Sequence, residues 1–282
     1  MNSQYFAQYL LNAGVLSQEA MSYLLGKARG RQASLPLLVI RQGLVTRGDA
    51  EALLASEDFK EAAVKQEILT QEEAERLLTA HPGETLRFGQ CLLDEGILTL
   101  DGLLDLLNRY DQESPRPAKE AVARVAGSAA KVELPLYEDF MELFMESLME
   151  FLETPAVIDV GPVEMYGSHK VMYAVSQRLE GKGSLVSGIA AYAADFVELS
   201  RRYSGEDIET VDELSIDSLE EFLNVVNGVF SVREATSKGS EFDLTLPRWG
   251  KVRSPVGNNQ LIMRIYTDFG SFLTILATDE FI

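Results

Sequence analysis

The sequence is poor in the residues that most often build metal and nucleophile sites. Its 282 residues include one cysteine, Cys91, two histidines, His81 and His169, and one tryptophan. A single cysteine excludes a disulfide within the chain. Neither histidine has a further ligand at metal spacing, so we expect no zinc or other metal site and no Ser-His-Asp triad.

Basic residues and long apolar runs are also scarce. The chain has 25 Lys and Arg against 44 Asp and Glu, which gives a formal net charge of -19. Because phosphate backbones are bound by clustered Lys and Arg, this balance argues against a nucleic-acid partner. No apolar run approaches the roughly 20 residues that cross a bilayer, and the start lacks a signal-peptide pattern. We therefore expect a cytoplasmic protein without a membrane partner.

What the sequence does contain is a set of four residues at fixed spacing. They follow the order acidic-x3-Glu-x2-Asn-x22-Pro and are Asp217, Glu221, Asn224 and Pro247. The surrounding residues predict a helix that begins at Asp217 as N-cap, with Glu220 completing a capping box, and that ends at Asn227-Gly228.

Apolar residues of this helix recur at i, i+3, i+4 and i+7, the spacing of a buried stripe: Leu219, Phe222, Leu223 and Val226. Glu221 and Asn224 fall outside the stripe and lie one turn apart, so we expect them on the outer face. A Glu and an Asn on such a face are usually only a solvated surface. The complete four-residue pattern favours a functional site instead.

With this motif the segment 134–282, about half the chain, resembles the CheX/CheC group of chemotaxis phosphatases. The resemblance implies hydrolysis of the aspartyl phosphate on a CheY-like receiver domain. It assigns Asn224 to hold the attacking water and Glu221 to pair with a Lys of the receiver. Asp217 is expected to cap the helix, and Pro247 to shape the strand region beyond it. Mg²⁺ is expected on the receiver, so the chain needs no cofactor of its own.

The resemblance also bears on symmetry and assembly. CheC proteins carry two copies of the motif, and the related helix here should lie near Glu138–Leu152. No Glu is followed three residues later by Asn in that stretch, so one active face is expected, as in CheX, and the resemblance implies a homodimer. Phe140, Phe144, Leu148 and Phe151 at helical spacing are predicted to be core.

A Pro pair near position 116 marks the predicted domain boundary. We assign 1–112 to a helical domain, 113–133 to a linker and 134–282 to the CheX-like domain, in which strands and helices predict an α+β sandwich. Predicted strands include a hairpin around Glu180–Gly183, Leu261–Tyr266 and Phe272–Ala277. Ala118–Ala130 could form a connecting helix instead of a flexible linker.

The first 112 residues contain an internal repeat of four helix-turn-helix copies: Leu10–Leu25, Leu38–Leu54, Ala62–Leu78 and Leu92–Leu107. They align at a turn position occupied by Gly14, Gly43, Glu67 and Gly96. The second helix of each copy is predicted to begin at Ser17, Thr46, Thr70 or Thr99. Because no copy can bury its apolar face alone, the four should stack into one all-α helical-repeat domain.

The repeats also resemble MshEN-type domains of secretion ATPases, some of which bind cyclic di-GMP. The fourth copy matches that motif through Arg87, Gly89 and Gly96, although Tyr110 replaces its closing Gln. The other copies lack its opening residues. A helical scaffold or docking module is the alternative interpretation for these repeats.

Together these patterns predict a response-regulator phosphatase whose helical module selects the partner or senses a signal. Two alternatives remain open. One is a non-catalytic adaptor that only holds a receiver domain, and the other is a signalling protein that responds to cyclic di-GMP through the N-terminal repeats.

Overall fold

The computed structural model describes residues 3–46, 48, 53, 58–79, 84–113, 115–127, 134–161, 171–181, 184–253 and 260–282. His81 and His169 lie outside this part of the chain. The chain forms two compact units, and each unit is made of two separate stretches of the sequence. The first comprises Met1–Tyr9 and Tyr23–Pro115, and the second comprises Leu10–Ser22 and Arg116–Ile282.

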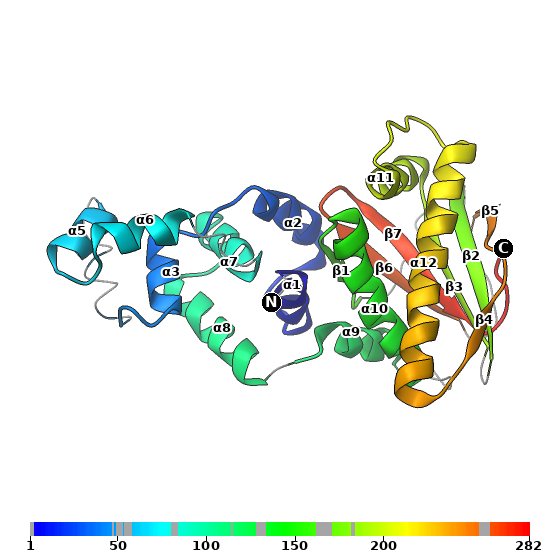
Figure 1. Cartoon of the computed structure of the whole chain (residues 1–282), viewed down its shortest axis with the longest axis horizontal. Coiled ribbons are helices and arrows are strands. Elements are labelled where there is room, and N and C mark those ends of the chain that lie inside the picture. Colours follow the sequence, from blue (N-terminus) through cyan, green and yellow to red (C-terminus); the bar gives the residue numbers. More distant parts are fainter. Residues whose placement is uncertain are drawn as a thin grey trace. The chain divides into compact units, whose positions relative to one another are not determined.

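The first part of the chain folds into helices over its described residues (Figure 1). Their bounds are α1 (Ser3–Asn12), a 3-10 turn (Gln18–Ala20), α2 (Met21–Arg29), α3 (Leu35–Arg41), α5 (Phe59–Lys65), α6 (Gln71–Thr79), α7 (Glu84–Asp94) and α8 (Leu100–Glu113). Residues from α3, α5 and α6 share one apolar cluster, which includes Val39, Ala63 and Leu77.

The turns of the repeat share one backbone conformation. The four aligned positions all have positive φ: Gly14 at 70°, Gly43 at 71°, Glu67 at 56° and Gly96 at 66°. Positive φ favours glycine because a Cβ is strained there. Glu67 therefore adopts the geometry that glycine supplies in the other three turns, which agrees with the alignment of the copies.

Two of the predicted helix starts are capped by their own side chains. The Thr70 hydroxyl accepts from the Glu73 N–H at 3.1 Å, and the Thr99 hydroxyl accepts from the Gly102 N–H at 3.2 Å. Ser17 stands at the N-cap of the 3-10 turn but makes no side-chain capping bond. The structure describes Thr46 but only isolated residues of the helix predicted to follow it.

The described residues of the second unit form a seven-stranded antiparallel sheet in the order β1-β6-β7-β3-β2-β4, with β5 also pairing β2. The strands are β1 (Ala156–Ile158), β2 (Met172–Gly181), β3 (Leu185–Ala191), β4 (Phe242–Leu244), β5 (Arg248–Val252), β6 (Leu261–Thr267) and β7 (Ser271–Ala277). The predicted hairpin is confirmed, with Leu179 opposite Leu185. β1 and β5 were not predicted.

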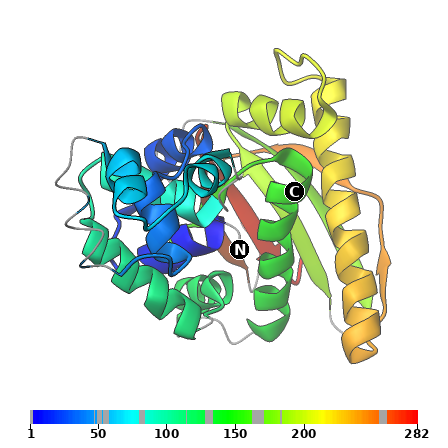
Figure 2. The same cartoon turned by 60° about the vertical axis from the view of Figure 1, so that its left-hand side comes forward.

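Among the described residues, four helices pack against this sheet: α9 (Pro117–Ala126), α10 (Leu134–Leu152), α11 (Ala193–Ser204) and α12 (Glu213–Lys238). Their buried residues share the main apolar core with one face of the sheet. Figure 1 and Figure 2 show α10 and α12 lying along that face. Phe281 and Ile282 pack with the opposite face. Phe281 lies where a Cβ on Gly188 would be, so only glycine fits at that position.

Helix α12 differs from its predicted extent, and Asp217 is not its N-cap. The helix begins after Asp212, whose carboxylate accepts from the Ser215 N–H at 2.9 Å while the Ser215 hydroxyl accepts from the Asp212 N–H at 2.8 Å. It continues through Asn227-Gly228 to Lys238, and Gly239, which has φ of 65°, is its C-cap. Burial of Asn227 and its neighbours on the sheet outweighs the roughly 1 kcal/mol cost of a helical glycine.

Two further details concern helices predicted near the domain boundary. The helical alternative to a linker is observed over Pro117–Ala126, where α9 contributes Ala121 and Val122 to the main core. In α10, Phe140, Phe144 and Leu148 are fully buried as predicted, but Phe151 is 36% exposed. The prediction for Phe151 was wrong because the buried stripe of α10 continues from Leu148 to Leu152, which is 2% exposed, and Phe151 lies beside that stripe.

Candidate functional site

The four motif residues meet in one groove of the second unit. The groove has a volume of about 440 Å³ and is lined by Asp217, Glu220, Glu221, Asn224, Leu244, Thr245, Leu246 and Pro247. Residues from α12 form one wall, and the segment that joins β4 to β5 forms the other. The spacing of 22 residues between Asn224 and Pro247 is therefore spanned by the end of α12 and by β4.

Helix geometry and strand pairing hold the two walls in place. Asp217, Glu221 and Asn224 are spaced i, i+4 and i+7, which places them on one side of α12. The opposite wall is fixed because both β4 and β5 pair with β2. In addition, the Thr245 N–H donates to the Arg178 carbonyl at 3.0 Å. Pro247, which lacks an N–H, stands directly before β5.

The groove is acidic. Asp217 and Glu221 are exposed, whereas Glu220 is partly buried. Burial, together with the charge of Asp217, raises the pKa of the Glu220 carboxyl. Burial and the charge of Glu221 likewise raise the pKa of Tyr203, so Tyr203 lies within the electrostatic reach of the motif glutamate. A cationic side chain would be attracted to this wall.

Asn224 is half-buried, and its amide belongs to a chain of buried polar groups. Gln177 on β2 donates through Nε2 to Asn224 Oδ1 and to the Thr245 carbonyl, both at 2.8 Å. Gln177 Oε1 accepts from Asn227 Nδ2 at 2.7 Å, and Asn227 Oδ1 accepts from the Ser187 hydroxyl at 2.8 Å. The helix exposes Glu221 as predicted, but it holds Asn224 at the edge of the core.

Sequence reasoning did not identify Gln177, Asn227 or Ser187. Asn227 was interpreted as part of a helix end, although it is fully buried in the middle of α12. Gln177 falls between Val175 and Leu179 on the strand face that points to the helices. A polar residue at an apolar position of an alternating strand was the signal that could have indicated a buried network.

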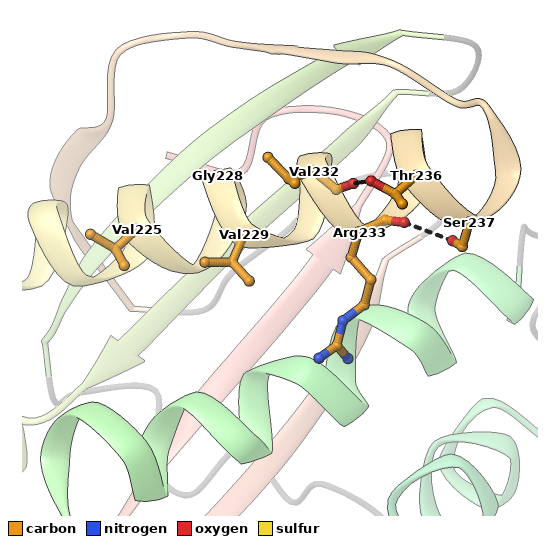
Figure 3. Close-up of a pocket in the computed structure, with 7 residues that line it drawn as sticks. All are labelled: Val225, Gly228, Val229, Val232, Arg233, Thr236 and Ser237. Atoms are coloured by element: carbon orange, nitrogen blue, oxygen red, sulfur yellow. Dashed lines mark hydrogen bonds between the residues drawn. The ribbon is translucent and has the colours of Figure 1, made fainter.

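An exposed apolar surface of α12 lies beside the groove. Figure 3 shows the residues that line it: Val225, Gly228, Val229, Val232, Arg233, Thr236 and Ser237. Val232 is 67% exposed, and Leu246 on the far wall of the groove is 86% exposed. Arg233 reaches toward α10, where Nη2 lies 3.0 Å from Glu146 Oε2. Apolar side chains exposed next to a polar groove are typical of a protein-binding surface.

The weaker set of predicted nucleotide-binding residues lies on α7 and the turn after it. Gly89 faces Leu103, and a Cβ at position 89 would lie 3.1 Å from a Leu103 methyl group. Gly96 supplies the positive φ of the fourth turn. Both glycines thus have structural roles in packing α7 against α8. Arg87 on α7 is partly buried.

The described part of the chain offers neither a metal-binding cluster of side chains nor a membrane-spanning helix. No group of three His, Cys, Asp or Glu side chains there could hold a metal ion. Among the same residues, no helix combines the length and apolarity of a membrane span.

The second unit is thus a sheet backed by helices. An acidic groove that carries the Asn224 amide lies at the side of α12. No family model and no curated protein matches the sequence. Solved structures to which the chain is similar include CheX- and CheC-like chemotaxis proteins, and these matches span about half of the chain.

Three of these structures show the range of similarity. CheX from Desulfovibrio desulfuricans is 12% identical, with a TM-score of 0.42, over 51% of this chain and 99% of its own. CheX from Vibrio vulnificus is 17% identical, with a TM-score of 0.41, over 50% and 97%. A CheX from Borrelia burgdorferi, solved in a complex with CheY, BeF3 and Mg²⁺, is 18% identical, with a TM-score of 0.40, over 50% and 95%.

Proposed function

We propose that this protein hydrolyses the aspartyl phosphate of a CheY-like response regulator. One observation carries the proposal: Asp217, Glu221, Asn224 and Pro247, which are dispersed over 31 residues of sequence, line one groove. The residue types in that groove suit a reaction that needs positioning more than strong acids or bases.

The chemistry requires little from the catalyst. A water oxygen forms a bond to phosphorus while the bond from phosphorus to the aspartyl oxygen breaks. The products are a free carboxylate and inorganic phosphate, which retains the proton lost by the water. Because an acyl phosphate is already reactive, the main contribution is to hold water in line with the leaving carboxylate. In this proposal Asn224 holds that water through its carboxamide.

Glu221 has a different part in the proposal. It is exposed on the acidic wall of the groove, where it can pair with a Lys beside the phosphorylated aspartate of the receiver. The receiver brings its own phosphoryl group and Mg²⁺, so the residues of this chain orient water and bind the partner. Asp217 lies one turn before Glu221 and adds negative charge to the same wall.

The exposed apolar residues extend the docking surface. A receiver domain that places its phosphoryl group beside Asn224 must also cover the adjacent turn of α12 and the facing loop. Val225 follows Asn224 directly, and Leu246 projects from the facing loop with 86% of its surface exposed. Burial of a leucine side chain contributes about 1.5–3 kcal/mol, so these contacts would supply affinity that Glu221 alone cannot.

For the rest of the chain we propose the two-domain layout 1–112 and 134–282, in which the helical repeats select the partner or receive a signal. We also propose that the protein acts as a homodimer. Neither proposal is needed for the hydrolysis itself, because the groove is complete within one chain.

The test is the decay rate of several phosphorylated CheY-like receiver domains with Mg²⁺, alone, with this protein, and with its Asn224→Ala variant. The proposal expects faster decay with the wild type and the basal rate with Asn224→Ala, while both bind the receiver with similar affinity. Unchanged decay on a receiver that binds would overturn the proposal and favour the adaptor.

A further inference from the structure

We propose that Gln177 is a positioning residue that fixes which end of the Asn224 amide faces the groove. The inference rests on the proposed function for its catalytic consequence, but its structural part stands on four hydrogen bonds. Gln177 is 2% exposed and does not line the groove, so it can act only through the groove residues that it contacts, Asn224 and Thr245.

Sheet geometry explains how Gln177 reaches Asn224. Gln177 on β2 is paired directly with Ser187 on β3, and alternation along the strands directs both side chains to the face covered by helices. Asn224 and Asn227 are three residues apart on α12 and therefore present neighbouring side chains to that face. The four side chains form a continuous polar line under the groove.

One backbone atom determines the orientation of all the amides in this line. The Thr245 carbonyl can only accept a hydrogen bond, so the Gln177 atom 2.8 Å from it must be Nε2. The same Nε2 lies 2.8 Å from Asn224, which must therefore present Oδ1 to it. Gln177 Oε1 is then the acceptor for Asn227 Nδ2, and Asn227 Oδ1 for the Ser187 hydroxyl.

The consequence for the groove is chemical. With Oδ1 held from inside by Gln177, Asn224 offers its Nδ2 hydrogens toward the groove. A water there would receive an N–H hydrogen bond on its oxygen and keep another lone pair for attack on phosphorus. If the amide were free to rotate by 180°, half of its orientations would instead present the carbonyl oxygen. Preorganisation of this kind contributes to rate without changing binding.

The test uses the full chain and Gln177→Met, which keeps the shape of the side chain but removes the donors. We expect the maximal rate of receiver dephosphorylation to fall about tenfold or more, with the receiver affinity unchanged. Thr274→Val is the matched control, because Thr274 is equally buried in the same sheet and its hydroxyl has no partner among the described residues. This variant should keep the wild-type rate. Equal rates for Gln177→Met and wild type would overturn the catalytic part of the inference.

A second measurement decides the amide orientation without any activity. Side-chain NH2 resonances should show Asn224 hydrogens that exchange with solvent at least about tenfold faster than those of Gln177 and Asn227. Equal protection of the Asn224 hydrogens would overturn the inference. If the wild type failed to dephosphorylate any receiver, the proposed function would fail and this measurement would still decide the orientation. Ser187→Ala, which removes only the last hydroxyl of the line, replaces Gln177→Met should that variant not fold, and it should give a smaller loss of rate.

Discussion

Asn224 and Asn227 lie one turn apart on α12 and contact the same side chain, because Gln177 donates to Asn224 at 2.8 Å and accepts from Asn227 at 2.7 Å. The motif asparagine at the surface is thereby connected to a fully buried asparagine. Buried amides are costly when they are unpaired, so each member of this line depends on the others.

Reversal of charge at Glu221 should weaken receiver binding. In Glu221→Lys the acidic wall loses a carboxylate and would oppose the receiver Lys, so we expect the dissociation constant to rise about tenfold or more. Titration against a receiver held in its phosphorylated form measures this. Glu150→Lys, an equal charge change at an exposed position of α10, should leave the affinity unchanged. Wild-type affinity in Glu221→Lys would contradict the docking role.

Leu246 offers a test of the apolar part of the docking surface. Because Leu246 is 86% exposed, Leu246→Asp should leave the free energy of unfolding nearly unchanged. Loss of its burial against a partner should raise the dissociation constant about tenfold. Leu44→Asp is the control, since Leu44 is also exposed but lies outside the groove. If both variants raised the dissociation constant equally, the loss of affinity would not depend on the position of Leu246 at the groove.

The turn at Glu67 should be improved by glycine. Glu67 has φ of 56°, where a side chain is strained, and Glu67→Gly should raise the free energy of unfolding by about 0.5–1 kcal/mol. The converse change, Gly96→Ala, should lower it by about 1 kcal/mol, since no atom lies within 4 Å of the added Cβ and only the backbone conformation resists it. Chemical denaturation measures both, and a loss of stability in Glu67→Gly would contradict the strain.

Asp195 in the first turn of α11 should give stability a pH dependence. Burial raises the pKa of Asp195 from 3.8 to about 6. A carboxyl with a raised pKa binds its proton more tightly when the chain is folded, so its contribution to stability is lost as the pH rises from about 4 to about 6. Asp195→Asn should remove that loss and be the more stable protein above pH 6. If the free energies of unfolding of the wild type and Asp195→Asn changed with pH in parallel, a raised pKa of Asp195 would be contradicted.

Periodicity was the part of the sequence that predicted structure well. The stripe from Leu219 to Val226 is fully buried as expected, and the hairpin and the strands predicted at Leu261–Tyr266 and Phe272–Ala277 are observed. β1 and β5 were missed because one is three residues long and the other is largely exposed. Such short strands are held by their partners rather than by a local pattern.

The start of α12 shows why the caps were harder to predict. Asp212 and Asp217 are each followed three residues later by a residue that can complete a capping box, Ser215 or Glu220. Local sequence therefore does not distinguish them. The extra turn is helical because Ile216 packs into the core, a contact that depends on the folded sheet. Gln177 is a similar case, since its partners are 47 and 50 residues away along the chain.

The segment after β4 has two effects on the groove that a substitution can separate. Leu246 and Pro247 shape its wall, whereas the carbonyl of Thr245 lies behind the wall and orients the amides. A shift of that single carbonyl would change the orientation of the Asn224 amide while the backbone of α12 stays in place. The segment between β4 and β5 therefore affects both the shape of the groove wall and the orientation of the Asn224 amide. In the proposed reaction, changes in this segment would alter turnover while every motif side chain stays intact.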